Sequence, residues 1–155
     1  MADRTLNAFR FQFSAFRFHG LAGPNAAVFF DSHMERVYRI LAVDNEPSVT
    51  TALRFVFDGP QYDIVCVGNG ADALAHLDRS TPFDVIIVDQ KMPKLTGVEL
   101  VQEIRRRGIE GKIIVVSANL SADVCEAYER MDVSLIFSKP FDIRQLRSAV
   151  EQLAA

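Results

Sequence analysis

Short apolar segments alternate with stretches of helical spacing over most of this 155-residue chain, and this alternation limits the possible fold more than any other feature. Strands that are covered on both faces read as continuous apolar runs, because neither side of the sheet meets water. Strands that alternate with helices form right-handed crossovers within a parallel sheet. The pattern therefore predicts an α/β fold with a five-stranded parallel sheet and helices on both faces. The five predicted strands are Ile40 to Val43, Ile64 to Val67, Val85 to Val88, Ile113 to Val116 and Leu135 to Phe137.

The stretches between and after these runs have recognisable helix ends. Pro47 suits the first turn of a helix that runs to about Phe57, because proline lacks the N–H that this position leaves unpaired. Thr96 and Glu99 have the spacing of a capping box ahead of VELVQEIRRR. Each of the remaining three helices is expected to follow a polar N-cap residue. These residues are Asn69, Ser121 and Asp142.

Length and charge favour a single domain that does not bind nucleic acid. A chain of 155 residues can bury one core and leaves little room for a second. The net charge is -3, whereas affinity for a nucleic-acid duplex depends on Lys and Arg that neutralise phosphates. The basic run from Arg105 to Arg107 is followed by Gly108, which is typical of the last turn of a helix and its glycine cap.

Cysteine, histidine and hydropathy patterns exclude several other classes. Cys66 and Cys125 lie far apart and neither belongs to a CxxC, and the three histidines share no metal-ligand spacing. We therefore expect no disulfide and no zinc site, and a cytoplasmic location. No apolar run approaches the roughly 18 residues that span a bilayer, so we expect no membrane span.

The first part of the chain differs in composition from the rest. Residues 1 to 33 contain seven of the twelve phenylalanines. We predict a boundary between an extension, residues 1–35, and a domain, residues 36–155. The extension fits either an amphipathic targeting or docking arm or a disordered or non-native segment, in which case Met34 is an alternative start.

Four of the five predicted strands end on a polar residue that can do chemistry. The carboxyl ends of parallel strands lie along one edge of the sheet, where such folds bind ligands. An oxygen-rich site without His or Cys suits Mg²⁺. A carboxylate beside Mg²⁺, a lysine and a small hydroxyl can accept a phosphoryl group. The residues concerned are Asp44 with Asn45, Asp89, Ser117 and Lys139.

From Val37 to Leu153 the chain resembles the receiver domains of bacterial two-component response regulators. The resemblance depends on four motifs in the right order, VDNEP, VDQKMPKLTGVEL, VVSAN and FSKPF. It implies a flavodoxin-like fold with the strand order 2-1-3-4-5.

The resemblance also implies roles for individual residues. Asp89 corresponds to the phosphoacceptor, and Ser117 and Lys139 correspond to the hydroxyl and the lysine that contact the phosphoryl group. Asp44 and Asn45 stand at the positions that hold Mg²⁺, and the Lys91 backbone carbonyl is a further ligand. The side chains of Lys91 and Asn119 flank the phosphoryl group and tune its hydrolysis. The bond between Lys139 and Pro140 is expected to be cis.

Two positions depart from the family pattern. Asn45 stands where the family usually has a second acid, which predicts weaker Mg²⁺ binding. Ile136 stands where many members have a Tyr or Phe that swings inward on activation, so coupling between the site and the rest of the domain is expected to be altered or to use another residue.

These features together predict a single-domain response regulator that is not an enzyme beyond its own phosphorylation and dephosphorylation. Its expected partners are a histidine kinase or phosphotransfer protein and a downstream protein target. One alternative is a pseudo-receiver, a binding module that acts without phosphorylation, which Asn45 and Ile136 favour. Another is a flavodoxin-like redox protein or small phosphatase, but DNEPS after the first strand is acidic and lacks the glycines or the run of hydroxyls that would hold a cofactor phosphate.

Overall fold

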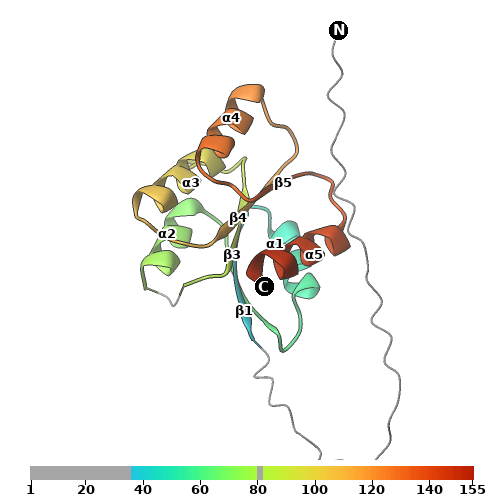
Figure 1. Cartoon of the computed structure of the whole chain (residues 1–155). Coiled ribbons are helices and arrows are strands. Elements are labelled where there is room, and N and C mark those ends of the chain that lie inside the picture. The colour runs from blue at the N-terminus through green and yellow to red at the C-terminus, as the bar shows by residue number, and fades with distance from the viewer. Residues whose placement is uncertain (1–35, 80–81) are drawn as a thin grey trace, which may run out of the picture. The chain divides into compact units, whose positions relative to one another are not determined.

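The computed structural model describes residues 36–79 and 82–155, which form one parallel sheet of five strands with five helices (Figure 1). The strand order is β2-β1-β3-β4-β5. In the register, Ile40 lies between Ile64 and Val85, and Ile114 pairs with Leu135. The predicted fold class and strand order are therefore confirmed. The strands are β1 (Tyr38–Val43), β2 (Tyr62–Val67), β3 (Val85–Asp89), β4 (Lys112–Ser117) and β5 (Leu135–Ser138).

The predicted helix ends are also confirmed. Thr96 and Glu99 form a complete capping box at the start of α3. Asn69 accepts a hydrogen bond from the backbone N–H of Asp72, and Ser121 and Asp142 accept equivalent bonds at their own helices. These side chains satisfy N–H groups that lack a partner within the helix. The helices are α1 (Pro47–Val56), α2 (Gly70–Arg79), α3 (Gly97–Arg106), α4 (Ala122–Arg130) and α5 (Ile143–Ala154).

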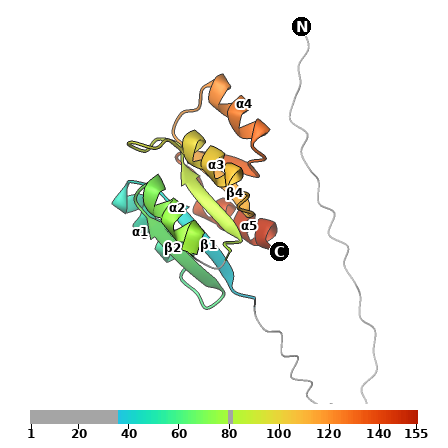
Figure 2. The same cartoon turned by 90° about the vertical axis from the view of Figure 1, so that its left-hand side faces the viewer.

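Helices cover both faces of the sheet, with α2, α3 and α4 on one face and α1 and α5 on the other (Figures 1 and 2). Alternate residues of each central strand point into two separate cores. Leu41 and Ile86 pack with the first group of helices, and Ile40 and Ile87 pack with the second. All four side chains are at most 1% exposed. The middle of each central strand is a continuous apolar run because it supplies both cores.

The edge strand β5 departs from the expectation that every strand is covered on both faces. Leu135 is 40% exposed and Ile136 is 39% exposed. An edge strand has only one neighbour in the sheet, so its side chains receive less cover. The apolar run predicted the strand correctly but not its exposure.

The basic run of three arginines has a structural role, as predicted. Arg105 donates hydrogen bonds to four backbone carbonyls, including those of Met131 and Asp132. Arg106 and Arg107 both pair with the Glu103 carboxylate. Gly108 follows with φ +66, the left-handed conformation that glycine adopts without strain. These contacts join the end of α3 to the loops around it.

Candidate functional site

The sheet topology brings the predicted site residues to one edge. Asp44 directly follows β1, Asp89 ends β3, Ser117 ends β4 and Lys139 directly follows β5. Because all five strands are parallel, these positions share the carboxyl edge of the sheet. Asp44, Asp89 and Ser117 are at most 3% exposed, whereas most polar residues lie at the surface. This edge therefore holds buried polar groups that need partners.

Lys139 provides a shared partner for the two buried carboxylates. Its Nζ lies 2.9 Å from Oδ2 of Asp44 and 3.2 Å from Oδ1 of Asp89. Oε1 of Glu46, which is largely exposed, lies 3.6 Å from the same nitrogen. Two buried negative charges thus face one partly buried positive charge. The cluster has a net negative charge that a cation or an electrophilic group would reduce.

The surroundings shift the pKa values of Asp89 and Lys139 in the same direction. Burial, followed by the charge of Asp44, raises the pKa of Asp89 above its usual range, and Lys139 only partly opposes this. Burial alone would lower the pKa of Lys139, but its hydrogen bond to Asp44 and the charges of both carboxylates outweigh that effect and raise it. Lys139 is therefore cationic at neutral pH, and the ionised form of Asp89 is less stable than that of an exposed aspartate.

Local backbone bonds hold the two carboxylates in place. Oδ1 of Asp44 accepts a 2.8 Å hydrogen bond from the Glu46 backbone N–H, which leaves Oδ2 for Lys139. The Asp89 carboxylate accepts a hydrogen bond from the Lys91 backbone N–H, which acts to lower its pKa. Both bonds arise within the turn that follows the strand.

Ser117 is buried beside these groups, and its hydroxyl is turned toward its own loop. The hydroxyl donates to the Asn119 carbonyl at 2.9 Å and accepts from the Asn119 backbone N–H. The backbone carbonyl of Ser117 accepts from the Lys139 N–H at 2.7 Å, ahead of the Lys139–Pro140 bond, which is cis as expected. The end of β4 thereby fixes the position of the lysine.

The remaining predicted site residues lie on the same edge but are exposed. Asn45, Lys91 and Asn119 all have side chains at the surface. Their positions after β1, β3 and β4 place them around the buried cluster. Their predicted roles toward a metal or a phosphoryl group stay predictions.

Sequence reasoning missed three residues near the cluster. Glu46 approaches Lys139, and Gln90, directly after Asp89, accepts a hydrogen bond from the buried hydroxyl of Tyr128 in α4. Glu46 and Gln90 were visible as polar neighbours of the predicted site. Tyr128 gave no such indication, because its contact with Gln90 spans 38 positions of the chain.

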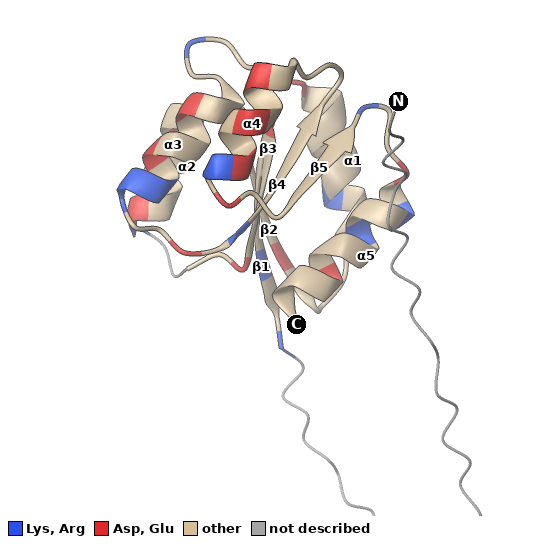
Figure 3. Ribbon diagram, turned by 45° about the horizontal axis from the view of Figure 1, so that its top comes forward, with Lys and Arg blue, Asp and Glu red and all other residues tan. Residues whose placement is uncertain are grey.

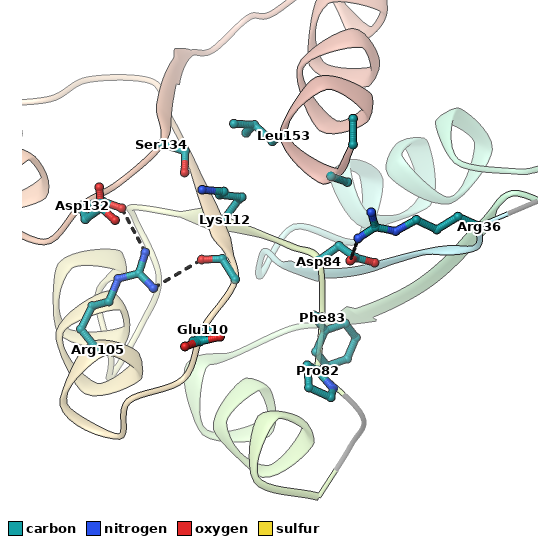
Figure 4. A pocket seen from close by; sticks show the side chains of 13 residues that line it. Arg36, Pro82, Phe83, Asp84, Arg105, Glu110, Lys112, Asp132, Ser134 and Leu153 are labelled. Atoms are coloured by element: carbon teal, nitrogen blue, oxygen red, sulfur yellow. Dashed lines mark hydrogen bonds and ion pairs between the residues drawn. The ribbon is translucent and has the colours of Figure 1, made fainter.

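A pocket lies at the other end of the sheet from these residues, where the strands begin (Figure 4). This pocket of about 500 Å³ is lined by residues at the amino ends of the strands, such as Asp84 before β3 and Lys112 at the start of β4. Asp84 pairs with Arg36 at 2.8 Å, and Arg105 is bonded to the Asp132 carbonyl. None of the predicted site residues lines it.

Charges of both signs are spread over the helices. Figure 3 shows Lys and Arg interspersed with Asp and Glu, and α3 and α4 each have both signs. Over the described parts of the chain, no helix is long and apolar enough to cross a membrane.

Comparison with known proteins identifies the family. The family model for the response regulator receiver domain matches residues 40–151. The chain belongs to the response regulator receiver domain family. It is therefore a module of two-component or phosphorelay signalling, in which an aspartyl phosphate and Mg²⁺ are typical, and receiver domains are generally signalling modules rather than enzymes.

Individual relatives show how much of the chain is similar to known proteins. Sporulation initiation phosphotransferase F of Bacillus subtilis is 27% identical over 114 residues, which are 74% of this chain and 91% of that protein. The regulator of RpoS of Escherichia coli is 34% identical over 72% of this chain, but the match spans only 33% of that regulator. The structure of the Francisella response regulator 1452 receiver domain has a TM-score of 0.69 at 25% identity, and covers 76% of this chain and 96% of that domain.

The chemistry of the cluster fits the Mg²⁺ that the family implies. In the described residues, no group of three or more His, Cys, Asp and Glu side chains is placed to hold a metal. A magnesium ion needs few protein ligands because it keeps several waters, and it accepts carboxylate, amide and carbonyl oxygens. Two buried carboxylates with one lysine also leave a negative charge for it to neutralise.

Proposed function

We propose that this receiver domain accepts a phosphoryl group on Asp89 from a histidine-phosphorylated partner and signals by a change in its protein contacts. The observation that best supports this is the single Lys139 ammonium within 3.2 Å of both buried carboxylates. A positive charge held beside a carboxylate can stabilise the oxygens of a transferring phosphoryl group. Stability alone does not account for this arrangement, because a buried ion pair is generally no more stabilising than apolar side chains of similar volume.

The proposed reaction transfers one phosphoryl group from nitrogen to oxygen. A carboxylate oxygen of Asp89 forms a bond to phosphorus as the bond between phosphorus and the donor's imidazole nitrogen breaks. The donor keeps the electron pair of that bond and returns to a neutral imidazole after taking up a proton. Dephosphorylation is a separate reaction: water attacks phosphorus, the bond between phosphorus and the Asp89 oxygen breaks, and the carboxylate of Asp89 and inorganic phosphate are released.

Each residue of the cluster has a proposed role in this transfer. Asp44, Asn45, Asp89 and the Lys91 carbonyl would hold Mg²⁺, which supplies positive charge to the phosphoryl oxygens when bound. Lys139 would contact one phosphoryl oxygen, and Ser117 would leave the Asn119 carbonyl to donate to another. The exposed side chains of Lys91 and Asn119 would control the access of water.

A direct experiment is incubation with acetyl phosphate and Mg²⁺ followed by mass spectrometry of the intact protein. We expect a mass gain of one phosphoryl group that is absent in Asp89→Asn. Asp58→Asn, a change of an exposed turn residue, is the matched control and should gain the same mass. A wild type that gains nothing would favour the pseudo-receiver alternative, in which the domain binds its partner without phosphorylation.

An apolar groove beside Lys139 fits a protein donor. Its volume is about 310 Å³, and its lining joins α1, through residues such as Ala52 and Val56, to the segment from Lys139 to Ile143. A donor that brings a phosphohistidine to Asp89 must cover the surface next to Lys139, and apolar area there would add binding energy. We therefore propose that the phosphodonor protein docks on this groove.

A charged side chain in the groove should distinguish phosphoryl transfer from a protein donor from transfer from a small-molecule donor. Ala52→Glu should slow transfer from a histidine-phosphorylated kinase that labels the wild type, and should leave labelling by acetyl phosphate unchanged. Ala75→Glu on α2, also half-buried but outside this groove, is the matched control. Equal rates of transfer from the kinase to wild type and Ala52→Glu would exclude the groove as the docking surface.

A further inference from the structure

Tyr128 makes the most deeply buried contact of α4 with the rest of the described domain, and the partly buried Val124 packs against the same core. The Tyr128 side chain is 0% exposed, and no other residue of α4 is buried. The hydroxyl donates a hydrogen bond to Oε1 of Gln90, directly after Asp89. A buried phenol needs such a partner, because an unpaired polar group in a core is costly. The position of α4 is thus linked to the residue next to the proposed phosphoacceptor.

Gln90 connects three elements at this point. Its Oε1 also accepts a hydrogen bond from the Val98 backbone N–H in the first turn of α3, at 3.1 Å. Its backbone N–H donates to the Val116 carbonyl of β4, and its backbone carbonyl accepts from the Gly97 N–H, both at 3.0 Å. An amide oxygen can accept two bonds, so Tyr128 and Val98 do not compete for it. Gln90 therefore cannot shift without disturbing α3, α4 or β4.

The packing around Gly97 leaves little freedom for this connection. A Cβ at residue 97 would lie 2.6 Å from the Tyr128 hydroxyl oxygen, 2.8 Å from the Asp89 carbonyl oxygen and 2.8 Å from the Gln90 Cα. The phenol, the end of β3 and the start of α3 thus meet at one point. The charge of Asp89 also contributes, after burial, to a raised pKa of Tyr128, which agrees with this proximity.

A change at Asp89 must be accommodated by these neighbours. Its side chain is 4% exposed, so an added phosphoryl group requires movement of the segment that follows β3. Residue 136, where many family members have a Tyr or Phe, is less suited to transmit the change, since Ile136 is apolar and 39% exposed. Apart from Tyr128, α4 packs on the core through partly buried side chains such as Val124, and elements with few buried contacts change conformation most readily.

We propose that Tyr128 and Gln90 are positioning residues that hold the segment after Asp89 against α3 and α4 and transmit a change at Asp89 to α4. This inference rests on the proposed function, because it requires Asp89 to accept a phosphoryl group. The hydrogen bond between Tyr128 and Gln90 would then have two effects. It would position the Lys91 carbonyl, one residue after Gln90, and it would make α4 respond to a change at Asp89.

Beryllofluoride, which can stand in for a phosphoryl group on a carboxylate, allows the coupling to be measured. Amide hydrogen exchange is followed in the full chain with and without beryllofluoride and Mg²⁺, and fluorine NMR reports how much is bound. In the wild type, binding should change exchange within α4. In Tyr128→Phe and Gln90→Met that change should fall to less than half. The double variant should show no further loss beyond that of Gln90→Met, because Gln90→Met already removes the hydrogen bond that Tyr128→Phe removes, together with the bond from the Val98 N–H.

Tyr62→Phe is the matched control for the loss of a tyrosine hydroxyl. Tyr62 is 8% exposed, and its hydroxyl donates a hydrogen bond to Glu151 and accepts one from Arg147, both in α5. This variant should lose stability but keep the full response of α4, which separates coupling from a general loss of stability. A second outcome would also support the proposal: Tyr128→Phe and Gln90→Met fold but no longer bind beryllofluoride, whereas Tyr62→Phe still binds it. This outcome would show that the hydrogen bond between Tyr128 and Gln90 positions the site.

Two other outcomes have distinct meanings. Full binding and an undiminished α4 response in Tyr128→Phe and Gln90→Met would overturn this inference and leave the proposed function intact. A wild type that neither binds beryllofluoride nor gains mass with acetyl phosphate would overturn the proposed function, and this inference with it.

Discussion

Replacing Asp89 with asparagine should stabilise the metal-free protein at neutral pH. The two carboxylates are both bound to Lys139, at 2.9 and 3.2 Å, so the bonded oxygens lie no more than about 6 Å apart. At that separation and an effective dielectric near 20, two negative charges repel by about 3 kcal/mol. The substitution removes this repulsion and the cost of burying a charge, but also the attraction to Lys139.

The sign of the net effect follows from the pKa of Asp89. That pKa is raised by burial and by Asp44, so their combined effect on the ionised form exceeds the attraction of Lys139. We therefore expect Asp89→Asn to increase the free energy of unfolding by about 1 to 3 kcal/mol. Asp58→Asn, at an exposed turn, should change it by less than about 0.5 kcal/mol.

Urea unfolding followed by circular dichroism, in buffer with a chelator, can measure this difference. A gain of 1 kcal/mol moves the midpoint by roughly 0.5 M when the slope is about 2 kcal/mol/M. An acid with a raised pKa binds its proton more tightly in the folded state, so the wild type gains stability as the pH falls through that pKa. The advantage of Asp89→Asn should therefore shrink toward acid pH, and also when Mg²⁺ binds the wild type. An Asn variant no more stable than the wild type at pH 7.5 without metal, or an advantage that grows on acidification, would refute this reasoning.

Three further changes test other parts of the site. Lys139→Met should lower the free energy of unfolding by about 3 to 5 kcal/mol at neutral pH, because it leaves two buried carboxylates without a counter-ion. Since the pKa of Lys139 is raised, the stabilisation that Lys139 provides should persist until the pH rises through that pKa. Urea unfolding of both proteins at several pH values would show this. Asn45→Asp should bind Mg²⁺ more tightly than the wild type in a calorimetric titration, because it restores a negative ligand, and equal affinity would contradict this. Gly97→Ala should destabilise the protein by about 1 to 3 kcal/mol, because its Cβ meets backbone atoms at 2.8 Å. Thermal unfolding would measure this loss, with Gly68→Ala as the control, because a Cβ at residue 68 would meet nothing within 4 Å. Equal losses in the two variants would exclude the close contact as the cause.

Sequence patterns predicted the secondary structure well because their causes are local. A cap such as Thr96 acts on a backbone group three residues away, and an apolar run such as Val85 to Val88 reflects the cover on its own strand. The motifs also placed Asp44, Asp89, Ser117 and Lys139 at one edge, because the ends of parallel strands must meet there. The domain boundary near residue 35 and the nature of the extension before it lie outside the described residues and stay predictions.

The contacts that give the site its properties came only from the tertiary structure. Lys139 meets Asp44 across 95 positions of the chain, and Tyr128 meets Gln90 across 38. No local pattern specifies such distances, because they depend on how the strands register and how the helices pack on the sheet. The same holds for β5, whose apolar run predicted a strand but not that Leu135 and Ile136 would be exposed at the edge. The sequence thus determined which residues reach the carboxyl edge, whereas packing decided that one ammonium bridges two carboxylates and that one buried phenol joins α4 to the segment beside them.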